Sequence, residues 1–245
     1  HAFAHPVTLG ATLGLVAVLA LVPLLFLLLK QLGRLEPKLS GELWLRYRSW
    51  LILVVLLLTP ILLGSAWTIL GIGLLSLLCY GEYARATGLF REKAISLVIV
   101  LGIGALTLAT LDHWYRLFVA LTPLTVALIG AVAILADRPK GYIQRVALGT
   151  LGFLLFGTAL AHLGFLANDS NYRPLLILVL LAVELNDVFA FCVGKTLGRH
   201  KLAANTSPNK TLEGSVGALI LTTGLVICIG WFIYPDSYRQ QYGIT

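Results

Sequence analysis

The sequence contains little charge, no methionine and no regularly spaced cysteines. Charged residues make up 12% of the 245 positions, hydrophobic residues make up 58%, and mean hydropathy is +0.91. This composition excludes a soluble globular domain and indicates a chain whose main solvent is lipid. Cys79, Cys192 and Cys228 lack C-x-x-C or metal-site spacing, so they predict neither a disulfide framework nor a zinc site. The lack of methionine leads us to expect a processed or altered chain.

Apolar runs long enough to cross a bilayer, which takes about 20 helical residues, recur along the chain. We expect an all-α polytopic transmembrane protein with about eight spans, at 8–29, 50–64, 66–80, 94–111, 117–136, 145–167, 174–194 and 216–234. The second and third runs are short, at about 15 residues each. They form either a tight hairpin around Gly64 and Ser65 or one long tilted span.

Basic residues alternate between the segments that follow these spans. Of the 18 Lys and Arg residues, all follow odd-numbered spans except Arg116, Arg173 and Arg239. Because cytoplasmic loops carry the excess of Lys and Arg, we expect both termini outside and the 195–214 segment in the cytoplasm. The expected location is an inner (cytoplasmic) membrane of a bacterium. The net charge of +7 then belongs to one face of the protein.

Two carboxylates interrupt the seventh run. Glu184 and Asp187 are three residues apart, so they share one face of a helix, and Asn186 lies between them. An ionised carboxylate in hydrocarbon costs about 2.5–3.5 kcal/mol, which a partner must offset. A salt bridge to another span is the simplest partner, but no Lys or Arg lies in the middle of any other predicted span. A metal ion or the basic segment downstream is therefore favoured.

The segment after this run has the composition of an anion-binding loop. Its basic residues can neutralise phosphates; they are Lys195, Arg199, His200, Lys201 and Lys210. The hydroxyls of Ser207 and Thr211 can contact a phosphate or a metal. The glycines, which permit close backbone approach, are Gly194, Gly198 and Gly214. We expect Pro208 to fix a turn before the last helix, whose amino end would face the site. Glu213 either completes a capping box, or binds a metal or orients a lysine. The segment is not a P-loop, because G-x-x-x-x-G-K-[ST] does not occur.

These residues resemble the phosphatidate cytidylyltransferase (CDP-diacylglycerol synthase) family. The family places an Asp before a short aromatic run, a G-[KR]-x-x-G-[KR]-H-K-L-like segment, and S-P-x-K-T-x-E-G-x-x-G-G. Here the three parts read Asp187 with Phe189 to Phe191, Gly194 to Leu202, and Ser207 to Gly217. The match covers 184–217 closely. Ala218 replaces the last glycine, and Phe191 stands where tyrosine is common.

The resemblance implies a magnesium-dependent transfer of CMP from CTP to phosphatidic acid. It implies that Asp187 binds Mg²⁺ and that Lys210, Ser207 and Thr211 belong to the catalytic group. Glu184, one turn deeper in the same helix, either joins Asp187 as a metal ligand or only buttresses the site. Substrate binding would involve a wider set: Lys195, Arg199, His200, Lys201, Pro208, Asn209, Glu213 and Gly214. CTP, phosphatidic acid and membrane lipids are the expected partners, nucleic acid is not, and a homodimer is left open.

The organisation expected is one membrane domain over 1–245, with a helical scaffold at 1–168 and part of the catalytic region at 169–245. The family's second signature, which includes a G-H-G-G-x-x-D-R-x-D run, does not occur before Thr245. We therefore expect the site to need residues beyond this sequence. The alternatives are a non-catalytic relative that binds lipid or nucleotide, a CTP-using enzyme with another lipid acceptor, a CTP-dependent lipid kinase, and a polytopic transporter.

Overall fold

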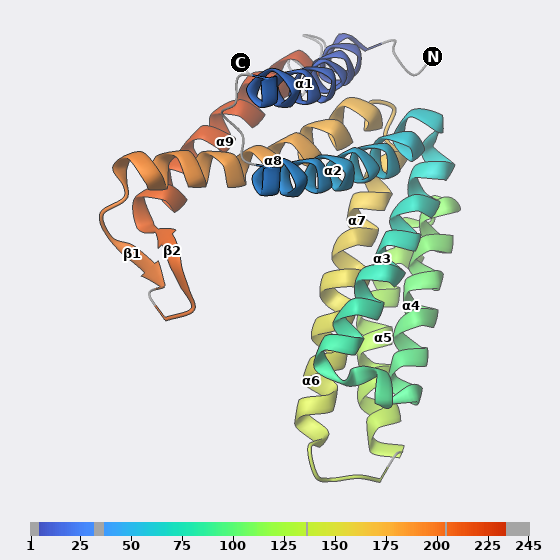
Figure 1. The fold of residues 1–245 in the computed structure, drawn as a ribbon. Coiled ribbons are helices and arrows are strands. Elements are labelled where there is room, and N and C mark those ends of the chain that lie inside the picture. Colours follow the sequence, from blue (N-terminus) through green and yellow to red (C-terminus); the bar gives the residue numbers. More distant parts are fainter. Residues whose placement is uncertain (1–4, 32–36, 136, 204, 234–245) are drawn as a thin grey trace. The chain divides into compact units, whose positions relative to one another are not determined.

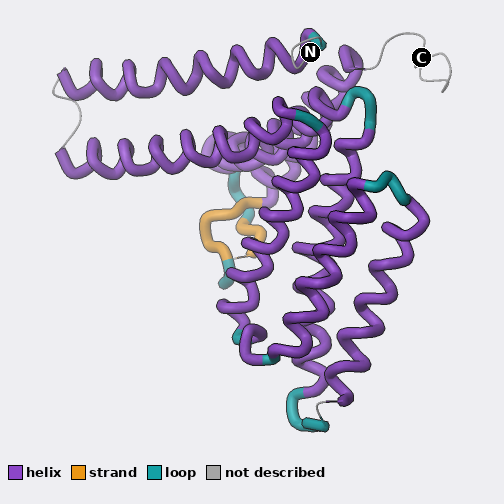
Figure 2. The backbone as a smooth tube through the Cα atoms, turned by 90° about the vertical axis from the view of Figure 1, so that its right-hand side faces the viewer, coloured by secondary structure: helices purple, strands orange, loops and turns teal. Residues whose placement is uncertain are grey.

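The structure, a computed structural model, describes residues 5–31, 37–135, 137–203 and 205–233 (Figure 1). Figure 2 shows helix nearly throughout the described chain, with one pair of short strands. Helices dominate because lipid offers no hydrogen bonds, so backbone groups must be paired within each segment. The all-α prediction is confirmed.

Helices occur at each of the eight predicted apolar runs. In chain order they are α1 (Pro6–Gln31), α2 (Pro37–Leu63), α3 (Ser65–Thr87), α4 (Lys93–Leu111), α5 (Tyr115–Leu135), the continuous run α6 (Tyr142–Gly152), η2 (Phe153–Ala159), α7 (Leu160–Phe165) and η3 (Leu166–Asn168), then α8 (Tyr172–Leu197) and α9 (Leu212–Ile233). A short 3-10 turn, η1 (Leu89–Arg91), precedes α4. Seven of the helices in the described chain are long and apolar enough to cross a membrane, while the apolar part of α2, Tyr47–Leu63, is shorter.

The chain divides into two compact units, one comprising His1–Tyr47 and Arg173–Thr245 and the other Arg48–Tyr172. We call them the terminal unit and the central unit. The boundary at residues 172 and 173 falls close to the predicted start of the catalytic region, and the terminal unit also includes α1. Within it, the Tyr47 hydroxyl donates to the Leu19 carbonyl oxygen at 2.8 Å.

The central unit is a bundle of α3, α4, α5 and the α6–η3 run. Its core contains Ile99, Leu106, Phe118, Ile129 and Phe153, each fully buried. The segment η2 is π-helical, and π turns within α-helices leave carbonyl groups in need of other donors. One of them, the Phe156 carbonyl, accepts the hydroxyl of Ser76 on α3.

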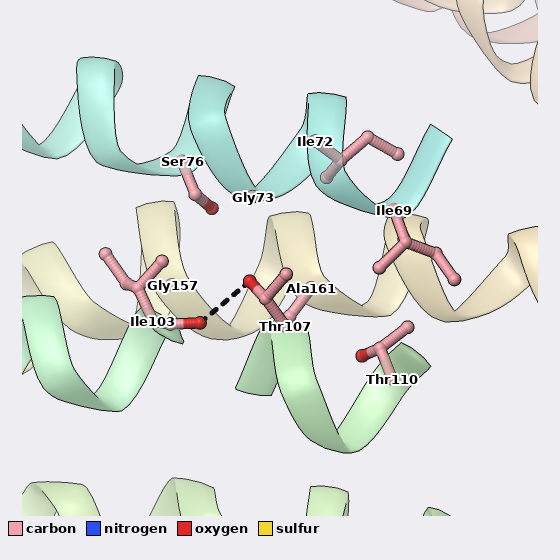
Figure 3. A pocket seen from close by; sticks show the side chains of 10 residues that line it. Ile69, Ile72, Gly73, Ser76, Ile103, Thr107, Thr110, Gly157 and Ala161 are labelled. Atoms are coloured by element: carbon pink, nitrogen blue, oxygen red, sulfur yellow. Dashed lines mark hydrogen bonds between the residues drawn. The ribbon is translucent and has the colours of Figure 1, made fainter. Parts of the chain in front are cut away.

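A small polar space lies between α3, α4 and the η2–α7 segment (Figure 3). The side chains of Ser76, Thr107 and Thr110 line it, and the Thr107 hydroxyl donates back to the Ile103 carbonyl at 2.9 Å. The space measures about 10 Å³, which is room for at most one water molecule. The central unit therefore has no substrate-sized cavity here.

Two glycines of α4 provide a matched test of this packing. A Cβ at Gly102 would lie 2.7 Å from Thr125 Cγ2 and 2.9 Å from Phe153 Cε2, whereas a Cβ at Gly104 would meet nothing within 4 Å. We expect Gly102→Ala to lower the free energy of unfolding by about 1–3 kcal/mol, because the added methyl group overpacks the core. Gly104→Ala should be neutral or slightly stabilising, since alanine favours helix. Thermal unfolding in detergent measures both, and equal effects would contradict this packing.

Candidate functional site

Close contact between α8 and α9 forms the base of the site. A Cβ at Gly214 would lie 2.7 Å from the Ala190 carbonyl oxygen and 3.0 Å from Gly194 Cα. One turn further along α9, a Cβ at Gly217 would meet Val193 Cγ1 at 2.6 Å. Only glycine permits such an approach without displacement. The recurring glycines of the motif therefore bring the C-terminal end of α8 against the N-terminal end of α9.

The connection between the two helices is a small β-hairpin. Strand β1 (Lys201–Ala203) pairs antiparallel with β2 (Ser207–Thr211), and Lys201 lies opposite Thr211. The expectation that Pro208 fixes a turn was wrong, since Pro208 lies exposed within β2. A two-stranded ribbon has only edge strands, and an edge strand accepts proline because the missing N–H can face away from its neighbour.

The carboxylate of Glu213 holds the start of this hairpin. Its oxygens accept the backbone N–H of Arg199 at 3.1 Å, the backbone N–H of His200 at 3.2 Å and the ring Nδ1 of His200 at 2.6 Å. The His200 side chain, then hydrogen bonds from backbone N–H groups, lower the pKa of Glu213 to about 2. Glu213 thus joins the first turn of α9 to the end of α8, a role that the sequence did not reveal.

The N-terminal end of α9 is already capped. The Thr211 hydroxyl oxygen accepts the Gly214 N–H at 3.2 Å, and the Leu212 N–H donates to the His200 carbonyl at 2.9 Å. These bonds satisfy donors that a helix otherwise leaves free. The capping role considered for Glu213 therefore falls to Thr211.

The basic side chains of the motif differ in their engagement. The Lys201 ammonium donates to the Pro208 carbonyl across the hairpin at 2.5 Å, and the Lys195 ammonium lies 5.6 Å from the centre of the Phe191 ring. Arg199 and Lys210 are exposed, and their side chains make no hydrogen bond or ion pair within the described ranges. These two cations are the ones most available to an anionic ligand.

The two carboxylates of α8 are exposed side chains on one helix face. Neither Glu184 nor Asp187 has a hydrogen-bond or ion-pair partner within the part of the chain that the structure describes. Between them, the Asn186 amide oxygen accepts the hydroxyl of Thr222 on α9 at 3.2 Å. Sequence reasoning missed Thr222, whose only signal was a polar residue in an apolar run.

The donor set suits a hard cation in type but is small in number. Among the described residues, no group of three or more His, Cys, Asp or Glu side chains could hold a metal ion. Mg²⁺ is usually bound by only one or two carboxylates together with substrate phosphates and water. Glu184 and Asp187 supply that number of carboxylates. The remaining predicted residues lie on the hairpin and the α9 start, with Ser207 half-buried, Asn209 exposed and Gly214 buried.

Comparison with known proteins finds one matching family and several similar proteins. Residues 44–244 match the model of the cytidylyltransferase family. The chain is 30% identical to "Uncharacterized protein YnbB" of Escherichia coli strain K12 over 237 residues, which are 94% of this chain and 76% of that protein. It is also similar to two proteins named phosphatidate cytidylyltransferase. The Staphylococcus haemolyticus protein is 32% identical over 37% of this chain and 36% of its own length, and the Rickettsia bellii protein is 36% identical over 38% and 39%. These two matches therefore span less than half of either enzyme. No solved structure shows a significant match.

The Glu213 contacts predict slow amide exchange at the start of the hairpin. Removing the charge in Glu213→Gln weakens the acceptor for the Arg199 and His200 N–H groups. We expect hydrogen–deuterium exchange of these amides to become about tenfold faster or more, while Glu82→Gln, which alters an exposed pair with Arg85, leaves them unchanged.

The same tether has a predicted pH range. A carboxylate whose pKa is depressed in the folded state stabilises the fold at every pH above its ordinary pKa. That stabilisation is lost as the pH falls through the pKa of the folded state. For Glu213 the ordinary pKa is 4.5 and the pKa in the folded protein is about 2. Protection in the unaltered protein, corrected for intrinsic exchange rates, should therefore persist at pH 4, and its loss between pH 6 and 4 would contradict the contacts described.

Proposed function

The chain belongs to the cytidylyltransferase family, and we propose that it transfers CMP from CTP to phosphatidic acid, giving CDP-diacylglycerol and pyrophosphate. Family membership supports a CTP-using membrane transferase. The lipid acceptor is the finer part of the proposal, and it is supported by the motif and by the location of the site on two apolar helices and the hairpin that joins them.

The observation that carries the proposal is the attachment of the hairpin to the helix that bears Asp187. Gly194 and Gly198 of that helix end pack against Thr211, and Glu213 binds the turn between them and the hairpin. Asp187 lies seven residues before Gly194, roughly 10 Å of helix rise. A charged nucleotide would suit a cationic hairpin that is held against the helix carrying this carboxylate.

In the proposed reaction, a phosphate oxygen of phosphatidic acid attacks the α-phosphorus of CTP. The bond between the α-phosphorus and the oxygen that bridges to the β-phosphate breaks, and pyrophosphate leaves with that bridging oxygen. Such a transfer needs little covalent help from protein, because positioning and charge neutralisation lower most of its barrier.

The residues of this chain would divide that task. Lys210 and Arg199, the two unengaged cations, would neutralise the triphosphate, and Ser207 would donate a hydrogen bond to a phosphate oxygen. Lys195 would face the lipid phosphate. Lys201, held by Pro208, and Thr211, which caps α9, would keep the hairpin in shape, while His200, Asn209 and Gly214 complete the binding surface.

Asp187 and Glu184 would hold Mg²⁺, which supplies further neutralisation of phosphate charge when it is bound. Asp187 is the more important of the two because it lies one turn nearer the hairpin. The basic loops would place this site on the cytoplasmic side of a bacterial inner membrane, where CTP is available.

Asp187→Asn tests the metal-binding role. The substitution keeps the size of the side chain and removes its charge, so we expect the turnover of CTP and phosphatidic acid by the full-length protein in lipid nanodiscs to fall at least about 100-fold. Asp112→Asn, at an exposed carboxylate of the central unit, is the matched control. Unchanged turnover in Asp187→Asn would remove this residue from the mechanism.

Lys210→Gln tests the availability argument for the cations. Loss of one charge-assisted contact to a phosphate weakens binding by about 1.5–3 kcal/mol, so KM for CTP should rise roughly 10- to 100-fold. Lys210→Arg should recover most of the affinity because it keeps the charge. If Lys210→Gln leaves both KM and kcat unchanged, Lys210 does not contact the nucleotide.

A further inference from the structure

A nearly buried arginine organises the loop between α5 and α6 in the central unit. The Arg145 side chain is only 15% exposed. Its Nη1 donates to the Lys140 carbonyl at 2.7 Å, its Nη2 donates to the Arg138 carbonyl, and its Nε lies 4.0 Å from Glu92 Oε1. The planar guanidinium fork suits such paired carbonyls. Arg145 therefore fixes the backbone of residues 138–140.

Backbone conformation in this loop is also specific. Gly141 has φ 73°, a left-handed conformation that favours glycine, and it precedes the first residue of α6. Pro139 lies between the two residues whose carbonyls Arg145 binds, and its ring fixes its own φ. Residues 138–141 are thus held in one conformation, although they include none of the motif residues.

Four cations are displayed around this fixed loop. We call Arg91, Lys93, Arg138 and Lys140 the cationic rim; all four are exposed. Arg138 Nη1 lies 3.9 Å from Glu92 Oε1, which places the loop beside the start of α4 and the neighbouring Arg91 and Lys93. Besides Glu92, the acidic residues of this region are Asp137 in the loop and Glu82, which pairs with Arg85 at 2.7 Å.

Exposed apolar side chains flank the rim. Leu135 is 83% exposed at the end of α5, Ile143 is 81% exposed in the first turn of α6, and Phe90 is 51% exposed under the Arg91 guanidinium, 5.5 Å from its ring centre. On a chain with spans long enough to cross a bilayer, such side chains belong in lipid. The rim then lies at the depth of the phospholipid headgroups.

We propose that the cationic rim is a binding site for the phosphate of an anionic phospholipid in the surrounding bilayer. The phosphate oxygens accept hydrogen bonds from Lys140 and Arg138, with Lys93 and Arg91 adding charge, and the acyl chains lie along Ile143 and Leu135. The rim shares no residue with the hairpin, and this proposal does not depend on the proposed transferase activity.

The contacts that Arg145 makes with residues 138 and 140 distinguish this proposal from a simple topological signal. A positive-inside signal depends on the number of Lys and Arg residues and not on the geometry of the loop. A binding site depends on geometry as well. Arg145→Lys separates the two, because it keeps the charge but replaces the fork that binds both carbonyls with a single ammonium group.

The test uses the full-length protein in detergent, titrated with short-chain phosphatidylglycerol and followed by native mass spectrometry. Phosphatidylglycerol is chosen because it is not the proposed substrate, so failure here leaves the transferase proposal untouched. We expect Arg138→Gln with Lys140→Gln to weaken binding roughly 10- to 30-fold, since each cation near a membrane surface contributes about a fivefold effect. Arg145→Lys should weaken lipid binding at least about threefold. The thermal unfolding midpoint of this variant is measured as well, to establish that it is folded. Arg116→Gln, at the opposite end of α5, should have no effect.

Several results would overturn the proposal. Equal binding of phosphatidylcholine would show that the rim has no preference for anionic lipid, and an equal loss in Arg116→Gln would show that the effect is not specific to the rim. Unchanged binding in Arg145→Lys would show that charge alone is responsible. Displacement of the lipid by excess glycerol 3-phosphate would identify a soluble phosphate ligand instead. If Arg145→Lys does not fold, the double variant decides, and full binding by it removes the site.

Discussion

The carboxylate of Glu213 is the contact on which the arrangement of the candidate site depends. It accepts two backbone N–H groups and a histidine ring nitrogen from residues 199 and 200, and so fixes where α8 ends relative to where α9 begins. The hairpin, its cations and the α9 cap follow from that connection. The depressed pKa of Glu213 reflects the same bonds, because each of them stabilises the ionised form.

The two units handle polar groups in different ways. The central unit pairs its hydroxyls with backbone carbonyls inside the bundle, as Ser76 and Thr107 do, and the space that these two side chains line has room for at most one water molecule. The terminal unit keeps Glu184, Asp187, Arg199 and Lys210 exposed. Polar side chains satisfied internally serve packing, whereas unpaired carboxylates within an apolar helix, such as Glu184 and Asp187, are costly in lipid and are candidates for ligand binding.

Much of this organisation could be predicted from the sequence, and the failures have physical causes. The hydropathy pattern predicted helices at eight apolar runs, because a segment that crosses a membrane must pair its backbone groups internally and a helix does so. The hairpin was not foreseen because β1 has only three residues and β2 contains Pro208. The Glu213 contacts join residues 13 and 14 positions apart, which no helical or strand period describes. Arg145 was counted only as a charge, since its burial depends on a loop fold that local patterns do not specify.

The most direct test of the central claim is to ask which phosphorus of CTP reaches the lipid. The full-length protein in nanodiscs containing phosphatidic acid and diacylglycerol would be supplied in parallel with CTP labelled at the α- or the γ-phosphorus, in the presence of Mg²⁺. CMP transfer predicts lipid label from the α-labelled nucleotide only, in a product that co-migrates with CDP-diacylglycerol. Label from the γ-phosphorus would identify a kinase, and the absence of lipid label from both would contradict the transferase account.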